Sequence, residues 1–71
     1  MFYIETILTT ISRQDYIMTI KGEYDSNISF EQIISDYIGK HIFITTDNNE
    51  CVFTKHIESF KINSIIKNKN Y

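Results

Sequence analysis

The 71-residue chain contains no alanine, proline or tryptophan, one cysteine and two glycines. A single cysteine cannot form an internal disulfide and is more typical of a reducing compartment than of a secreted scaffold. Two glycines are too few for the glycine-rich loops that cradle phosphate groups. The sequence shows no secretory leader and no apolar run near the roughly 20 residues that span a bilayer. We therefore expect a cytoplasmic protein that does not enter the membrane.

Isoleucine supplies most of the apolar content, with fifteen residues against one leucine and one valine. Isoleucine, asparagine, lysine, tyrosine and phenylalanine have AT-rich codons, so mutational bias explains this skew better than packing does. The composition indicates a low-GC bacterium, its phage or a plasmid as the source. A chain of this length forms one small domain, which buries only about 60% of the surface that the unfolded chain exposes.

The formal net charge is −2, and acidic and basic residues are interspersed. Because phosphate neutralisation supplies much of the affinity for duplex nucleic acid, this balance favours a protein partner over nucleic acid. The chain contains no nucleophile elbow, phosphate-binding loop, zinc-knuckle spacing or calcium loop. We therefore predict a non-enzymatic binding protein with no cofactor and no metal. Together with the composition, this suggests a phage or mobile-element accessory protein that inhibits a host or defence protein.

Residues 2–24 are rich in threonine, isoleucine and tyrosine, which predicts two β-strands joined by a loop at residues 12–15. A four-residue loop that pairs Ile11 with Tyr16 places Ile7 opposite Ile20. In this register the odd-numbered residues of the first strand form the buried face.

A short helix is predicted after the polar connection at residues 22–28. Ser29 has the side chain of a helix N-cap, and Gln32 completes a capping box. Gly39 is expected to end the helix, because a left-handed residue costs least without a Cβ atom. An apolar stripe follows one face of this helix: Phe30, Ile33, Ile34, Tyr37 and Ile38.

A second hairpin is predicted from residues 41–46 and 51–56, around a turn at residues 47–50. Centring the turn on its two asparagines places Ile44 opposite Phe53 and His41 opposite His56. Both faces then carry large apolar groups. The face that contains Phe43 is therefore expected to be covered by a second copy of the chain, as in a homodimer, unless the first hairpin folds over it.

The C-terminal part is predicted to begin with a bend at residues 57–59. Residues 60–66 alternate imperfectly and favour a last strand, although Ile57, Phe60, Ser64 and Ile65 would also fit a helical stripe. Residues 67–71 are expected to form a polar, disordered tail, so the domain covers residues 1–66. The predicted fold is α+β, with four or five antiparallel strands and one short helix in the order β-β-α-β-β(-β). A small SH3-like or Sm-like barrel is the alternative arrangement.

Two groups of residues are candidates for binding a partner. An acidic and aromatic connection precedes the helix, and aromatic and basic residues occur on the helix and on the second hairpin. Aromatic residues are enriched in binding hot spots. The candidate residues are Glu23, Tyr24, Asp25, Tyr37, Phe43, Lys55 and His56.

The segment from Val52 to Ser59 holds an aromatic strand, a Lys-His pair, a short aliphatic bend and a serine. This pattern resembles the second Sm motif of the bacterial Sm-like RNA chaperone family. The resemblance implies that Lys55 and His56 meet RNA or a neighbouring subunit. It makes an RNA-binding Sm-like or SH3-like module the alternative function, although here the predicted helix lies in the middle of the chain.

Overall fold

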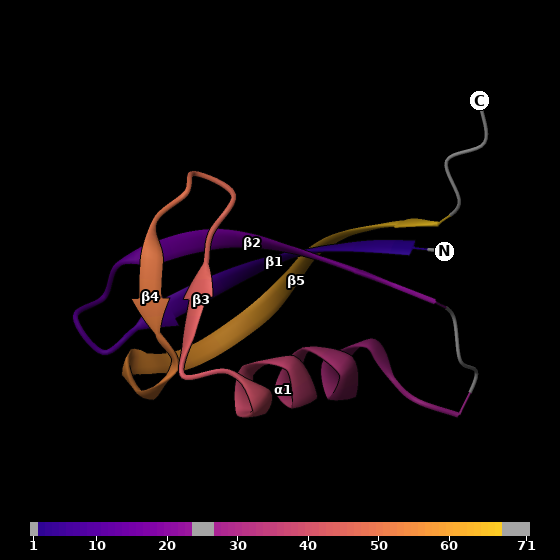
Figure 1. Ribbon diagram of the computed structural model, residues 1–71. Helices are drawn as coiled ribbons and strands as arrows, with labels where there is room; N and C mark the ends of the chain where they lie inside the picture. The colour runs from indigo at the N-terminus through magenta and orange to yellow at the C-terminus, as the bar shows by residue number, and fades with distance from the viewer. Residues whose placement is uncertain (1, 24–26, 68–71) are drawn as a thin grey trace.

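The computed structural model of the chain describes residues 2–23 and 27–67. In these two ranges, five strands, one α-helix and one 3-10 turn follow one another (Figure 1). Their order is β1 (Phe2–Thr10), β2 (Asp15–Gly22), α1 (Phe30–Lys40), β3 (Phe43–Thr45), β4 (Cys51–Phe53), the 3-10 turn (Thr54–His56) and β5 (Ile57–Lys67). The predicted α+β fold with one helix and a last strand is confirmed.

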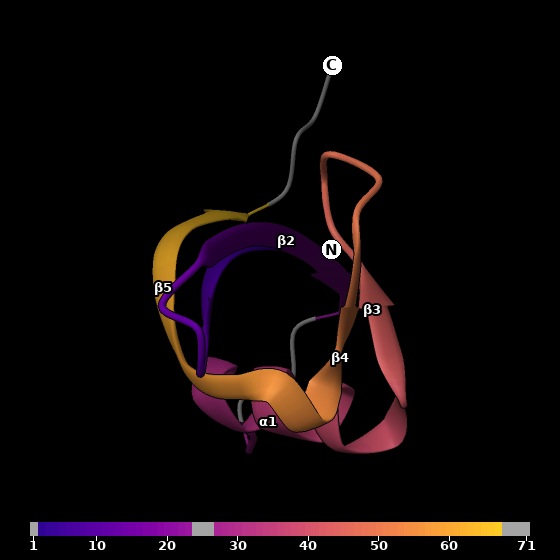
Figure 2. The same ribbon diagram turned by 90° about the vertical axis from the view of Figure 1, so that its left-hand side faces the viewer.

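The strands form two antiparallel sheets, one with the order β2-β1-β5 and one that consists of β3 and β4. In the view along the molecule, β5 lies on one side and the β3–β4 hairpin on the other, with β1 and β2 above and α1 below (Figure 2). The elements thus surround one core in a barrel-like ring. Within the described residues the strands pair inside each sheet only, so no continuous ladder closes this ring. No helix in these ranges is long and apolar enough to cross a membrane.

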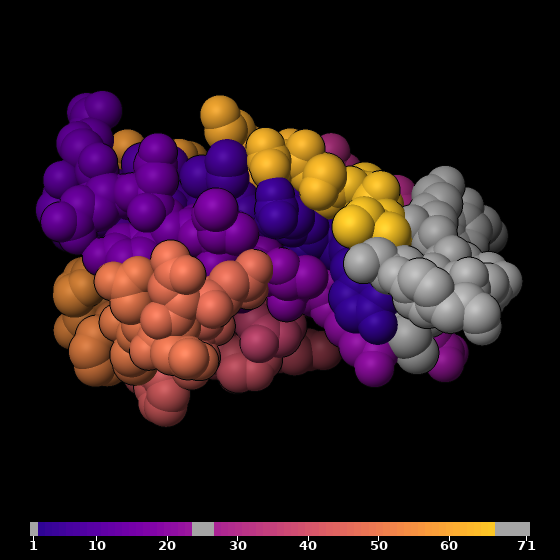
Figure 3. All heavy atoms as spheres, turned by 90° about the horizontal axis from the view of Figure 1, so that it is seen from above, coloured from indigo at the N-terminus to yellow at the C-terminus, as the bar shows by residue number. Residues whose placement is uncertain are grey.

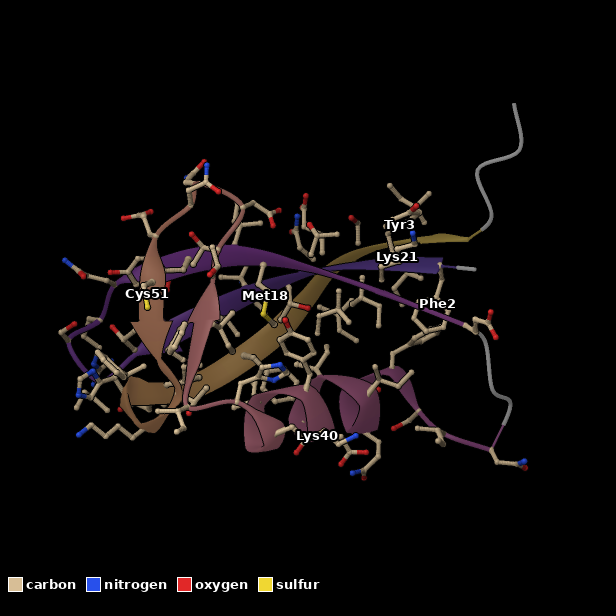
Figure 4. All side chains as sticks on the ribbon, in the orientation of Figure 1. Phe2, Tyr3, Met18, Lys21, Lys40 and Cys51 are labelled. Atoms are coloured by element: carbon tan, nitrogen blue, oxygen red, sulfur yellow. The ribbon has the colours of Figure 1, made fainter. Side chains whose placement is uncertain are left out.

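The core lies between the three-stranded sheet, the β3–β4 hairpin and the helix. The side chains of Phe2 and Met18 point from the sheet into this space, whereas Tyr3 lies on the other side of the sheet (Figure 4). On β1, every second residue from Phe2 to Thr10 is buried. The buried apolar residues are Phe2, Ile4, Leu8, Met18, Ile20, Ile34, Ile44 and Val52.

The helix begins at the predicted N-cap, Ser29, whereas the side chain of Gln32 donates to Asp36 instead of closing a capping box. The Ser29 hydroxyl accepts a hydrogen bond of 3.1 Å from the backbone N–H of Gln32, which satisfies one of the free donors of the first turn. The apolar stripe faces the core, with Ile34 fully buried at its centre. The predicted helix end is wrong: Gly39 lies inside the helix with a negative φ, and His41 is the C-cap in an extended conformation.

The predicted register of the first hairpin is also wrong. Ile7 lies opposite Ile17, and Thr9 lies opposite Asp15, a shift of three residues from the expected pairing. The cause is the loop, which has three residues and ends at Arg13 with a φ of 68°. A shift by an odd number exchanges the two faces of a strand, so the even-numbered residues of β1 are buried.

The second hairpin turns in the same way. Its three-residue loop ends at Asn49 with a φ of 61°, and the register places Phe43 opposite Phe53 and Ile44 opposite Val52. The prediction was wrong by one residue. Consequently Phe53 lies on the same face as Phe43 rather than on the face of Ile44. The ladder ends before His41 and His56, so the predicted pairing of these two residues is wrong as well.

The last strand is longer than predicted, because residues 57–59 belong to it and Lys67 ends it. Residues 68–71 of the expected tail lie outside the described residues. Two irregularities interrupt the pairing of β5 with β1, and they leave Glu58 and Asn63 without a directly opposite residue. These β-bulges explain the imperfect alternation of the sequence. Along β5, the inward positions fall on Ile57, Phe60, Ile62 and Ile65.

Candidate protein-binding surface

The most exposed apolar side chains near the second hairpin lie on or beside its outer face. Ile42 is 80% exposed, Phe43 51% and Phe53 46%. Because side chains alternate along a strand, burial of Ile44 and Val52 in the core turns the residues on either side of them outward. We call the group formed by Phe43, Thr45, Cys51 and Phe53 the outer hairpin face, and the exposed Ile42 lies beside it, just before β3.

Two phenylalanines form the centre of the outer hairpin face. The rings of Phe43 and Phe53 lie directly opposite each other on neighbouring strands, with centroids 6.4 Å apart and planes at 73°. Edge-to-face contact of this kind stabilises an aromatic pair beyond the burial of its area. Seen from above, the hairpin forms a lobe on the flank of the molecule opposite β5 (Figure 3). The aromatic pair is therefore carried on an accessible part of the molecule.

A groove of about 350 Å³ runs between β4 and the turn of the first hairpin. The turn contributes Ile11, which is 61% exposed, and β2 contributes Tyr16. A hydrogen bond of 2.9 Å from the backbone N–H of Ile11 to the carbonyl oxygen of His56 connects the two walls. Cys51 and Phe53 form the β4 side of the groove, so it adjoins the outer hairpin face.

Charges of opposite sign lie at the two ends of β4. Glu50 precedes the strand at the tip of the hairpin, and Lys55 and His56 follow it in the 3-10 turn. All three side chains are exposed. The ring of His56 packs edge to face against Phe53, with centroids 6.0 Å apart. The apolar surface thus has an acidic end and a basic end.

The structure brings two of the predicted binding residues together, because the rings of Phe43 and His56 both contact that of Phe53. Lys55 precedes His56 in the 3-10 turn. Tyr37 is half-buried against the core, and its ring stacks on that of His41 at 4.3 Å. Glu23 directly follows β2, whose end lies far from the β3–β4 hairpin (Figure 1). Tyr24 and Asp25 lie outside the described residues.

The sequence analysis missed Phe53, Ile42 and the groove residues Ile11 and Tyr16. Phe53 was missed because the predicted register placed it on the buried face with Ile44. The signal that could have corrected this is local. Thr10 stands four residues before Gln14, and Thr46 stands four residues before Glu50. In each pair, the threonine hydroxyl oxygen accepts a hydrogen bond from the backbone N–H of the later residue. The repeated spacing marks the three-residue loop in both hairpins.

The two histidines serve separate local contacts. The Nδ1 atom of His41 lies 2.7 Å from the carbonyl oxygen of Tyr37 and so contributes to the end of the helix. His56 packs on Phe53 and lines the groove. Among residues 2–23 and 27–67, no three His, Cys, Asp or Glu side chains gather closely enough to hold a metal ion.

The comparisons with known proteins returned no matching family model, no matching curated protein and no matching solved structure. The features of the molecule that bear on function are the outer hairpin face, the groove beside it and the charges at the ends of β4.

Proposed function

We propose that this protein is a non-enzymatic binding protein that docks on another protein through its outer hairpin face. The observation that carries the proposal is the exposed pair of Phe43 and Phe53 on a hairpin whose other face is anchored in the core. In the context of the AT-biased composition, the role that fits best is a phage or mobile-element accessory protein that inhibits a host or defence protein. The free, exposed thiol of Cys51 is compatible with a reducing, cytoplasmic location.

The arrangement has the features of a small protein interface. Binding energy concentrates in a few aromatic side chains that lose contact with water, while a polar rim surrounds them. Phe43 and Phe53 would supply that centre, and Glu50 and Lys55 would supply part of the rim. Since the two rings already contact each other, little side-chain freedom is lost when a partner covers them.

The distribution of basic residues supports a protein partner over RNA. Lys21 lies on β2, Lys40 at the end of the helix, Lys55 in the 3-10 turn and Lys61 on β5. A phosphate backbone is bound by basic residues that follow one groove or one face. These four lysines belong to four different elements, and Glu50 places an acidic residue at one end of the hairpin that carries the aromatic pair.

A pull-down from the lysate of a low-GC bacterium tests the proposal. The baits are the parent chain, the double variant F43S/F53S and the control variant I66S, which removes an apolar side chain of 42% exposure from β5. We expect a protein that the parent and I66S retain after nuclease treatment and that F43S/F53S loses. Thermal melting of each bait shows that it is folded.

Two results would contradict the proposal. Recovery of RNA alone, lost on nuclease treatment, would favour the Sm-like function. Equal retention of the same protein by F43S/F53S and the parent would show that binding does not use the outer hairpin face.

A further inference from the structure

Within residues 2–23 and 27–67, the backbone hydrogen bonds of the β3–β4 hairpin leave the outer edge of β4 unpaired. The backbone N–H of Thr46 donates to the carbonyl oxygen of Glu50 at 2.7 Å, and that of Thr54 donates to Ile42 at 2.9 Å. In an antiparallel pair, hydrogen-bonded and non-hydrogen-bonded positions alternate. Ile44 and Val52 therefore form the hydrogen-bonded pair between these two.

It follows that Cys51 and Phe53 occupy non-hydrogen-bonded positions, so their N–H and C=O groups point away from β3. This outer edge borders the groove between β4 and the first hairpin. A strand edge with unpaired N–H and C=O groups is a template for one more strand. The free edge and the groove thus coincide.

The walls of the groove limit what can occupy it. The turn that carries Ile11 forms the wall of the groove that faces β4. The backbone N–H of Ile11 is hydrogen-bonded to the carbonyl oxygen of His56. In a folded second copy of the chain, β4 is attached to the core through Val52, which is 6% exposed. That copy would therefore have to place its core beside the groove as well. A single extended segment brings no such bulk. Ile11 and Tyr16 would contact its apolar side chains.

We infer that the groove binds an extended segment of the partner protein, which adds to β4 as an antiparallel strand. Charge complementarity defines the segment: its N-terminal end is acidic and lies near Lys55, and its C-terminal end is basic and lies near Glu50. Its central residues are apolar. This inference rests on the proposed docking function and names the chemistry that the partner presents.

A synthetic peptide tests this pattern. The chain's own segment from Glu50 to Lys55 has the required order of charges, so the probe is the blocked peptide Glu-Ser-Val-Phe-Thr-Lys, with serine in place of the cysteine. The control peptide, Lys-Ser-Val-Phe-Thr-Glu, has the same composition and exchanged ends. Binding to the full chain is followed by amide chemical shifts in nuclear magnetic resonance spectra.

We expect the probe to shift the amide signals of Cys51 and Phe53 more than those of Phe43 and Thr45, whose amides point to the other edge of the hairpin. We expect it to bind about tenfold more tightly than the control peptide, because two opposite-charge contacts replace two like-charge contacts. The double variant E50K/K55E should reverse this preference. The variant C51P should lose binding yet stay folded, since the N–H that it removes does not bond to β3.

Three results would overturn the inference: no shift of the Cys51 and Phe53 amides at millimolar peptide, equal binding of the two peptides, or no reversal in E50K/K55E. Sedimentation of the purified chain provides a further outcome. A dimer that dissociates when the probe is added would identify a second copy as the occupant and would also overturn it. Because these assays use the chain without lysate, their failure beside a successful pull-down would leave the proposed docking function standing.

Discussion

The carboxylate of Asp47 accepts two hydrogen bonds from Thr19, one from its backbone N–H at 3.0 Å and one from its hydroxyl at 2.6 Å. The backbone N–H of Asp47 in turn donates to the carbonyl oxygen of Ile17 at 2.9 Å. One aspartate at the hairpin turn thus takes the place of a neighbouring strand along the edge of β2. This contact ties the two sheets together at a point where no ladder joins them.

Replacing Asp47 with alanine should lower the free energy of unfolding by about 1–2 kcal/mol, because charge-assisted hydrogen bonds to a backbone donor are lost. Asparagine should cost less, since it keeps one acceptor oxygen for the N–H of Thr19. Urea unfolding measures both values. The control is T19V, which removes only the hydroxyl contact. If the double variant T19V/D47A loses the sum of the losses of T19V and D47A, the two side chains do not interact as described.

The hydroxyl of Thr6 is buried at the centre of the sheet and has no hydrogen-bond partner among the described residues. Valine has nearly the same shape without the polar oxygen. We therefore expect T6V to raise the free energy of unfolding by about 1 kcal/mol.

The matched control for T6V is T10V. Thr10 is also buried, but its hydroxyl contacts Ser12 at 2.9 Å and the backbone of Gln14 at 3.3 Å. T10V should therefore destabilise the protein in the same urea assay. Destabilisation by T6V as well would mean that the Thr6 hydroxyl has a partner, such as a bound water.

The two glycines should respond oppositely to alanine. Gly39 lies in the helix, and a Cβ added there meets nothing within 4 Å, so G39A should stabilise the protein by about 0.5–1 kcal/mol. A Cβ on Gly22 would lie 3.2 Å from the buried ring of Phe2, so G22A should destabilise it by about 1 kcal/mol. Thermal melting compares the two variants with the parent. An unchanged or lower melting temperature for G39A would contradict the helical position of Gly39.

Arg13 and Asn49 hold equivalent left-handed positions in the two hairpin loops, with φ of 68° and 61°. Glycine adopts this conformation without strain, whereas arginine tolerates it less well than asparagine. R13G should therefore raise the stability by about 0.5–1 kcal/mol, and N49G should change it less. Chemical unfolding of both variants measures the difference. An equal gain in both proteins would show that the residue type does not matter at this position.

The arrangement of strands and helix was predictable, because its signals are local. Ser29 begins the helix through its own hydroxyl, and the stripe around Ile34 fixes the face that packs on the sheet. The register was not predictable from the apolar pattern alone. In β1, threonines and isoleucines occupy both faces, so the pattern did not show that Thr6 and Thr10 would be buried.

The prediction of the candidate surface failed for the same reason, because it depended on the strand register. A one-residue error at the second turn exchanged the faces of Val52 and Phe53 and paired His41 with His56. Phe43, whose face was expected to be covered, is 51% exposed. The groove could not be predicted, because it depends on the approach of the Ile11 turn to β4. These residues are distant in sequence, and only the tertiary structure brings them together.

The position of β1 has a consequence for the synthesis of this protein. β1 lies between β2 and β5, and its first residue, Phe2, lies opposite Lys67 of the last strand. A nascent chain can form the first hairpin early, but the other edge of β1 stays open until β5 has left the ribosome. Contacts between such distant segments slow folding, typically to a scale of about milliseconds to seconds. The three-stranded sheet therefore forms only after β5 has been synthesised, and the edge of β1 stays accessible to chaperones during that interval.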